Sequence, residues 1–185
     1  MKATTDLSSF DNSHFSPGKN HLTVILWFII GRIFINTYFP VPISLKRFVL
    51  RAFGASIGKG LVIKPKVNIK YPWNLSVGDF CWIGEQVWID NLVKVTLGNH
   101  VCLSQGAMLL TGNHNYKKTS FDLIVRTIVL EDGVWVGAKS TVCPGVRCKS
   151  HSMLGVGSIA TASLEPYSIY FGVPAQAIRT RSISE

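Results

Sequence analysis

The chain has 185 residues, of which 47% are hydrophobic and 16% charged, so it is large enough to bury a core and is not expected to be disordered. Nineteen lysines and arginines against ten acidic residues give a net charge of +9, which favours anionic partners such as phosphates, acidic glycans or a membrane surface. The basic residues are dispersed and form no recognised module, so nucleic acid is not an expected partner.

The first 21 residues form a polar lead, and residues 22–55 form an apolar and basic helical segment. The stretch LTVILWFIIGRIFINTYF at 22–39 is nearly long enough to cross a bilayer, but it contains Arg32 and Asn36 and ends at Pro40. These residues make it a poor transmembrane helix, and the polar lead ahead of it does not fit a cleavable signal peptide.

The next stretch, ISLKRFVLRAF at 43–53, predicts a basic amphipathic helix. Its predicted apolar face contains Leu45, Phe48, Val49 and Phe53. Two interpretations stay open for the segment 22–55. Its helices either cap the open end of the core domain or dock on an anionic membrane surface.

From residue 56 to residue 165 an apolar or small residue recurs every six positions, a period that fits neither a helix nor an alternating strand. A second small or aliphatic residue often follows four positions later. The repeating residues are Ile57, Ile63, Ile69, Val77, Ile83, Ile89, Leu97, Leu103, Leu109, Leu130, Val136, Val142, Cys148, Leu154 and Ala160. Such hexapeptide repeats predict short parallel strands wound into a β-helix, because one short strand cannot bury its apolar side chains alone.

The repeat slips after every third side of its first half. The steps from Ile69 to Val77 and from Ile89 to Leu97 are eight residues long, and the step from Leu109 to Leu130 is twenty-one. If three sides make one coil, all three insertions fall on one edge of a triangular spiral. The longest insertion, a loop at 112–126, projects from a rigid wall, where binding and catalytic groups are common.

The chain resembles the left-handed β-helix acyltransferases that use acetyl-CoA, and within them the branch that O-acetylates exopolysaccharide sugars. The resemblance covers roughly residues 45–180. It is carried by VWIDNLVKVTLGNHVCLSQGAMLLTGNHNY at 87–116, GVWVGAKSTVCPGV at 133–146 and GVPAQAIR at 172–179. It implies a mainly β fold, a left-handed parallel β-helix of about five coils, assembled as a homotrimer with a carbohydrate acceptor.

The resemblance also implies site residues. It makes His114 the catalytic base at a cleft between subunits and puts Asp90, Asn91, Asn113 and Tyr116 on the side of the sugar acceptor. The residues it assigns to acetyl-CoA are Trp135, Gly137, Ala138, Gly155, Val156, Gly157, Ser158, Thr161 and Arg179, the last of these in a C-terminal tail at 166–185. No metal is expected.

Two positions depart from the family pattern. Relatives in this branch usually have aspartate directly after the loop histidine, where this chain has Asn115, so the group that orients the imidazole stays open, with Asp122 as a candidate. Gln176 replaces a basic residue of the galactoside enzymes.

Histidine suits acetyl transfer to a hydroxyl, because an alcohol is a poor nucleophile until its proton is leaving. The side chain ordinarily has a pKa of about 6.5, and a positioned base contributes roughly 10² to 10⁴ in rate. Asp90 and Asn91 would hold sugar hydroxyls for attack, although aspartate and asparagine also favour ordinary turns.

Two other functions remain alternatives at this stage. A γ-carbonic anhydrase-like protein shares the β-helix, but His100, His114 and His151 are not spaced like its zinc site. A non-enzymatic trimeric scaffold would use the basic N-terminal helices to bind a membrane surface.

Four cysteines, at positions 81, 102, 143 and 148, form no CxxC pair, so a disulfide scaffold is not expected. With no leader sequence evident, the protein is expected in the cytoplasm, with peripheral association at the inner face of the cytoplasmic membrane as a further hypothesis.

Overall fold

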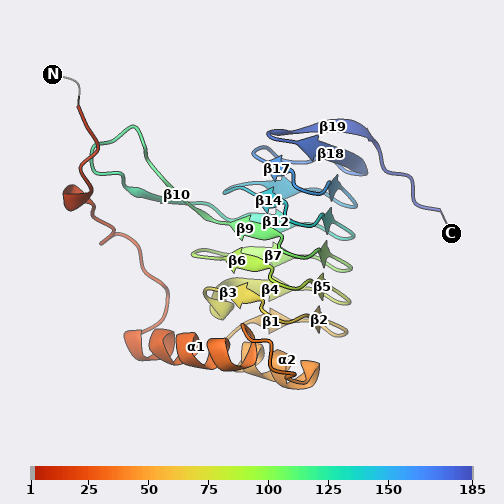
Figure 1. Ribbon diagram of the computed structural model, residues 1–185, viewed down its shortest axis with the longest axis horizontal. Helices are drawn as coiled ribbons and strands as arrows, with labels where there is room; N and C mark the ends of the chain where they lie inside the picture. The colour runs from red at the N-terminus through yellow and green to blue at the C-terminus, as the bar shows by residue number, and fades with distance from the viewer. Residues whose placement is uncertain (1–2, 185) are drawn as a thin grey trace.

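The protein, a computed structural model that describes residues 3–184, is built around short parallel strands wound into a β-helix (Figure 1). Each coil contributes one strand to each of three faces, and each strand pairs with its equivalents in neighbouring coils. Face 1 consists of β1 (Ser56–Ile57), β4 (Leu75–Val77), β7 (Val95–Leu97), β12 (Ile128–Leu130) and β15 (Arg147–Cys148). Face 2 consists of β2 (Val62–Ile63), β5 (Trp82–Ile83), β8 (Cys102–Leu103), β13 (Trp135–Val136), β16 (Met153–Leu154), β18 (Ser168–Gly172) and β19 (Ala175–Thr180). Face 3 consists of β3 (Asn68–Ile69), β6 (Trp88–Asp90), β9 (Met108–Leu110), β14 (Thr141–Val142) and β17 (Ile159–Ala160).

The inward side chains are those that the sequence period predicts. All fifteen repeating residues are at most 9% exposed, and the second inward position, as at Val134, Ser140 and Val146, is buried as well. The turns between faces require left-handed backbone, which glycine adopts readily. His100 and His151 occupy such turns with φ of 56° and 58°.

The three insertions lie on one edge, the edge where face 3 passes to face 1, as predicted. The first forms a 3-10 turn, η2 (Pro72–Asn74), and the second covers residues 91–94. The third carries a hairpin of β10 (Gly112–His114) and β11 (Leu123–Val125) that projects from the spiral (Figure 1). The strands on both sides stay in register, so each insertion bulges outward without breaking the stack.

The C-terminal end contains more spiral than the five predicted coils. Leu164 bridges to Cys148, and β18 pairs in parallel with β16, which starts a sixth, incomplete coil. Strand β19 then folds back antiparallel on β18, so the segment predicted as a tail forms a hairpin.

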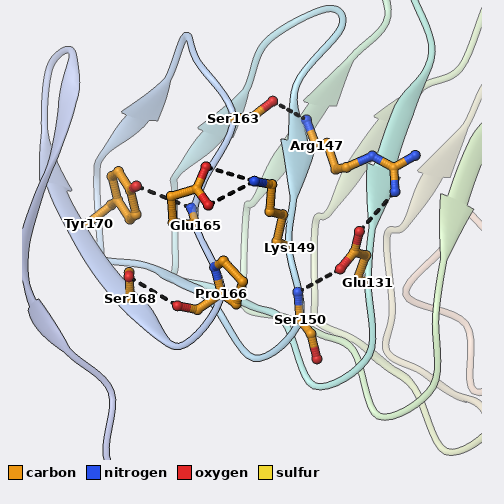
Figure 2. Close-up of polar contacts among 9 residues, drawn as sticks. All are labelled: Glu131, Arg147, Lys149, Ser150, Ser163, Glu165, Pro166, Ser168 and Tyr170. Atoms are coloured by element: carbon orange, nitrogen blue, oxygen red, sulfur yellow. Dashed lines mark hydrogen bonds and ion pairs between the residues drawn. The ribbon is translucent and has the colours of Figure 1, made fainter.

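Polar contacts connect these last coils across face 1 (Figure 2). Arg147 Nη1 lies 2.8 Å from Glu131 Oε1, and this hydrogen bond lowers the pKa of Glu131. Lys149 Nζ lies 2.7 Å from Glu165 Oε2 one coil further on. Exposed ion pairs contribute only about 0–1 kcal/mol each to stability, so we expect these pairs mainly to help keep neighbouring coils in register.

Helix α2 (Ile43–Ala52) caps the first coil, whose backbone carbonyls have no preceding coil to pair with (Figure 1). Arg47 Nε donates to Leu61 O at 2.8 Å, Arg51 Nη2 to Ile57 O at 2.8 Å, and Lys46 Nζ to Lys64 O at 3.3 Å. Unpaired strand edges invite aggregation, and these three cations occupy that edge.

The cap corrects the predicted apolar face of α2. Lys46 is 3% exposed and Leu50 is fully buried, whereas Phe48, a member of the predicted apolar face, is 67% exposed. Relative to the predicted orientation the helix is rotated about its axis, because its cations bind the free carbonyls of the first coil. Burial lowers the pKa of Lys46.

Helix α1 (His21–Phe34) lies beside α2, and η1 (Leu7–Ser9) precedes it in the lead. Trp27 of α1 is 2% exposed, and its Nε1 donates to Ile69 O at 3.0 Å. No helix in the described part of the chain is long and apolar enough to cross a membrane.

A buried serine offers a test of the interior. Ser152 Oγ has no hydrogen-bond partner among residues 3–184, whereas Ser140, at the same repeat position, donates to Gly155 O. A buried hydroxyl without a partner costs about 1–3 kcal/mol, so Ser152→Ala is expected to raise the melting temperature. Ser140→Ala is the matched control and is expected to lower it. The prediction is wrong if both variants melt below the parent protein in differential scanning calorimetry.

Candidate active site

The hairpin on the edge between faces 3 and 1 places the loop histidine. Strands β10 and β11 pair antiparallel, with His114 opposite Leu123. The backbone N–H of Asn115 donates to Asp122 O at 2.8 Å and closes the loop beyond the pair. His114 therefore sits on an ordered two-stranded element.

The imidazole of His114 is oriented by a backbone carbonyl. Its Nδ1 lies 2.9 Å from Phe121 O. Because a carbonyl oxygen can only accept, Nδ1 carries the proton, and in the neutral ring Nε2 is the nitrogen with the free lone pair. The ring also stacks on the Phe121 ring, with centroids 4.4 Å apart and planes 6° from parallel. Phe121 has φ of 51°, an uncommon conformation for a non-glycine residue, and such backbone often marks functional sites.

The structure answers the question about Asp122. Its carboxylate accepts from Lys118 Nζ at 2.8 Å and from Ser120 Oγ at 2.5 Å, and these hydrogen bonds lower its pKa. The candidate role of Asp122 in orienting His114 is therefore wrong, because Phe121 O holds the imidazole nitrogen.

His114 lines a pocket of about 390 Å³ on this edge. Asp90 lines the same pocket, and its Oδ1 lies 3.0 Å from Lys70 Nζ, which lines it too. The pocket thus contains one basic nitrogen acceptor, one carboxylate and one ammonium group, a set able to bind sugar hydroxyls. The lining consists of Phe10, Asn12, Phe15, Lys70, Tyr71, Asp90, Leu92, Gly112, His114 and Leu123.

The polar lead, which has no predicted role in the site, forms one wall of this pocket. Phe10 lies with its ring centroid 5.8 Å from that of His114, and Asp6 N donates to Thr119 O at 2.9 Å. At the first insertion on the same edge, Trp73 Nε1 donates to Pro17 O at 2.6 Å. Isolated aromatic residues in an aperiodic segment give no sequence signal for such a contact.

Asn91, predicted to face the acceptor, does not reach the pocket. Its side chain is fully buried, its Oδ1 accepts from Tyr71 N at 3.0 Å, and its Nδ2 donates to Tyr71 O at 2.6 Å. The amide replaces a strand partner at the insertion, so the predicted substrate contact is wrong. Of the other predicted acceptor residues, Asn113 Oδ1 accepts from His114 N, and Tyr116 is 73% exposed.

Removal of this amide tests the structural role of Asn91. We expect Asn91→Ala to reduce the free energy of unfolding by about 1–3 kcal/mol, because both backbone groups of Tyr71 lose their partner. Denaturant titration measures the loss. The KM for the acceptor should stay unchanged, and a raised KM with normal stability would restore the role predicted from the sequence.

The predicted acetyl-CoA residues lie mainly on another edge, where face 2 passes to face 3. Turn residues of successive coils stack there, and Gly157 N donates to Ala138 O at 2.9 Å. Val156 is 64% exposed, and nothing lies within 4 Å of a Cβ built on Gly157. Trp135 is 39% exposed on the adjoining face 2, where its Nε1 donates to Ser104 Oγ at 2.9 Å.

Three predicted members of this set are buried by the fold itself. A Cβ on Gly137 would meet Val156 N at 2.7 Å, and one on Gly155 would meet the ring of Phe171. Ser158 is 1% exposed, and its Oγ accepts from Gly172 N at 3.1 Å. In this chain these residues allow coils and hairpin to approach, and they do not line an open groove.

Two further predicted residues lie apart from that edge. Thr161 follows β17 on the edge between faces 3 and 1, and Arg179 lies exposed on β19 of the terminal hairpin. The structure therefore distributes the predicted acetyl-CoA residues over face 2, two edges of the spiral and the terminal hairpin.

The three histidines weighed for a zinc site, His100, His114 and His151, lie apart. His100 stacks on Phe80 and His151 on Tyr167, both on the edge between faces 1 and 2 and away from His114. No group of three or more histidine, cysteine, aspartate or glutamate residues within 3–184 could hold a metal ion.

The four cysteines are free, and burial raises the pKa of each thiol. A thiol with a raised pKa is a poor nucleophile near neutral pH. They are therefore poor candidates for a covalent acyl carrier.

Comparison with known proteins identifies the class. No protein-family model matches the chain. The protein named as colanic acid biosynthesis acetyltransferase WcaF of Escherichia coli is 34% identical over 180 residues, which cover 97% of this chain and 99% of that protein. Galactoside O-acetyltransferase of Escherichia coli is 25% identical over 147 residues, 78% of this chain and 72% of that protein.

The fold has a counterpart among solved structures. A hexapeptide-repeat acetyltransferase from Vibrio cholerae, in complex with acetyl-CoA, superposes with a TM-score of 0.81 over 92% of this chain and 94% of that chain, at 20% identity. The chain belongs to the family of hexapeptide-repeat acetyltransferases. Within that family it is a full-length relative of WcaF, and the carbonic anhydrase alternative is not favoured.

Proposed function

We propose that this protein transfers the acetyl group of acetyl-CoA to a hydroxyl of a sugar in an exopolysaccharide or lipid-linked oligosaccharide precursor, with His114 as the general base. The observation that carries the proposal is the imidazole on the pocket wall, held through Nδ1–H by Phe121 O so that Nε2 is free to accept a proton. The similarity to WcaF over the full chain supports the choice of acceptor class.

The chemistry needs no covalent enzyme intermediate. Nε2 of His114 takes the proton of the sugar hydroxyl as its oxygen attacks the thioester carbonyl. The new C–O bond forms, the C–S bond breaks, and the imidazolium returns its proton to the departing thiolate. The raised pKa values of the buried thiols support this direct transfer over a route through cysteine.

Asp90 and Lys70 are proposed to position the acceptor. The two side chains form an ion pair of 3.0 Å on the pocket wall, with 18% and 35% of their side-chain surface exposed. A carboxylate accepts from sugar hydroxyls and an ammonium group donates to them, so the pair can fix the attacking oxygen near Nε2. Asn113 and Tyr116 remain proposed contacts at the mouth of the loop.

We propose a homotrimer in which the site is shared between subunits. His114 lies on the edge between faces 3 and 1, whereas the exposed turn residues Val156 and Gly157 lie on the edge between faces 2 and 3, stacked on half-buried Ala138. The hairpin also projects away from its own spiral (Figure 1). A neighbouring copy can therefore offer its coenzyme edge, with Trp135 and Arg179 beside it, to the imidazole.

The base is tested by His114→Ala. We expect turnover to fall by about 100-fold or more, because a positioned base contributes 10² to 10⁴ in rate, while coenzyme binding measured by calorimetry stays nearly unchanged. Thiol release from acetyl-CoA with a panel of sugars measures turnover. Near-normal turnover would remove His114 from the mechanism.

Asp122→Asn is the control from the same loop. Because Asp122 binds Lys118 and Ser120 and does not touch the imidazole, this variant should retain turnover within a few-fold. If it loses as much activity as His114→Ala, the carbonyl of Phe121 is not sufficient to orient the base.

The acceptor class suggests where the reaction occurs. Lipid-linked sugar intermediates are membrane-bound, so we propose that the protein works at the inner face of the cytoplasmic membrane. The surface that supports this location is at the N-terminal end of the spiral.

A further inference from the structure

Most of the circumference of helix α1 is apolar, but only one side of the helix is covered. Trp27 and Gly31 face the first coils and are buried. On the opposite side five aliphatic side chains follow the i, i+3, i+4, i+7, i+11 spacing of one helical stripe. They are Leu22 (67% exposed), Ile25 (55%), Leu26 (45%), Ile29 (53%) and Ile33 (53%).

Further large apolar side chains are exposed nearby in the chain. Phe39, just after α1, is 71% exposed, and Phe48 on α2 is 67% exposed. Both helices lie across one end of the spiral, which we call the base (Figure 1). Exposed large apolar side chains that cluster on one surface mark a binding surface for another molecule.

The charge of this region defines the partner. Residues 12–78 contain nine lysines and arginines and no aspartate or glutamate. Three of these cations cap the first coil, but Arg32 on α1 and Lys19 just before it are exposed. Two more of the nine, Lys59 and Lys70, form ion pairs with Asp79 and Asp90. The exposed lysine and arginine on α1 and just before it carry positive charge, and an apolar stripe beside them complements a bilayer with anionic lipids. A second copy of the chain would bring positive charge against positive charge.

We propose that the base docks on an anionic membrane, with α1 lying in the plane of the interface and its stripe inserted among the lipids. At about 1.5 Å per residue, the 14 residues of α1 extend about 21 Å, which is shorter than the roughly 30 Å hydrocarbon core, so the helix rests on the bilayer. In the proposed trimer, a threefold axis along the spiral turns all three bases to the same side, which strengthens binding through avidity.

If the base docks on a membrane, the position of the hairpin along the spiral determines how far His114 stands from the lipid. Together with the proposed function, on which this step rests, that distance narrows the class of sugar acceptor. The spiral stands on the membrane, and the hairpin with His114 leaves after β9, in the third coil. With strands about 4.8 Å apart, that coil lies about 10 Å above the first. The pocket spans this height, from Lys70 just after β3 in the first coil to the His114 hairpin, so the acceptor that fits it is a lipid-linked glycan that extends from the membrane along this edge.

The test is vesicle co-sedimentation of the full chain. The probes are vesicles of phosphatidylcholine alone and of phosphatidylcholine with 30% phosphatidylglycerol, at low and high salt. The variant is Ile25→Gln with Ile29→Gln, and the control is Ile183→Gln, whose side chain is 58% exposed at the other end of the chain. Circular dichroism checks that both variants fold, and thiol release with an acceptor that the parent protein uses checks the active site.

We expect salt-sensitive binding of the parent protein and the control to the anionic vesicles, and at least 10-fold weaker binding of the base variant, with equal thiol release. Equal vesicle binding by the variant, or none by the parent protein, overturns the proposal. If the parent binds no vesicles but forms a larger assembly that the variant loses in analytical ultracentrifugation, the base is an interface between copies. If neither soluble nor lipid-linked sugars support thiol release although vesicles are bound, the catalytic proposal fails and the docking surface stands.

Discussion

The structure depends on the repetition of one backbone contact, in which each coil donates and accepts hydrogen bonds in register with the coils before and after it. Each strand has only two or three residues in most coils and could not persist alone. Stacking gives it partners on both sides and a column of buried side chains, such as Ile83, Leu103 and Val136 on face 2. The same repetition leaves unpaired carbonyls at the first coil and an uncovered last coil. The segments before and after the spiral fold so that they cover these two ends. Helix α2 supplies cations to the first, and the β18–β19 hairpin covers the second.

The repeating part of this fold could be predicted from the sequence because its signal is local and periodic. A six-residue period in buried aliphatic residues specifies which side chains point inward, and the places where it slips specify one edge. The features that the sequence did not predict depend on contacts with residues that are far away in the chain. Helix α2 is rotated to bring Lys46 to the carbonyls of the first coil, a requirement that hydrophobic patterning of eleven residues cannot express. The sixth coil lacks the repeat residues and was missed for that reason.

The candidate site shows the same division between local and distant information. His114 stands out in the sequence because it interrupts a period, and the family motif assigns it chemistry. Its orientation comes from Phe121 O, a backbone atom that every residue type would provide, so residue identities alone pointed to the wrong group, Asp122. Asn91 was misassigned for a related reason. In the sequence, a polar residue beside a pocket cannot be distinguished from one that replaces a strand partner. The burial of the side chain in the structure distinguishes them.

The base of the spiral meets two demands that oppose each other. Capping the first coil draws cations inward, to the carbonyls of Ile57, Leu61 and Lys64. A helix pair in water would then present polar groups on its outer side, but here the outer side of α1 is aliphatic and the nearest exposed charges are positive. Capping alone does not require this outer surface, because the cap residues and the stripe lie on different helices. The stripe therefore calls for a second partner, and an anionic bilayer satisfies both its apolar character and the sign of the surrounding charge.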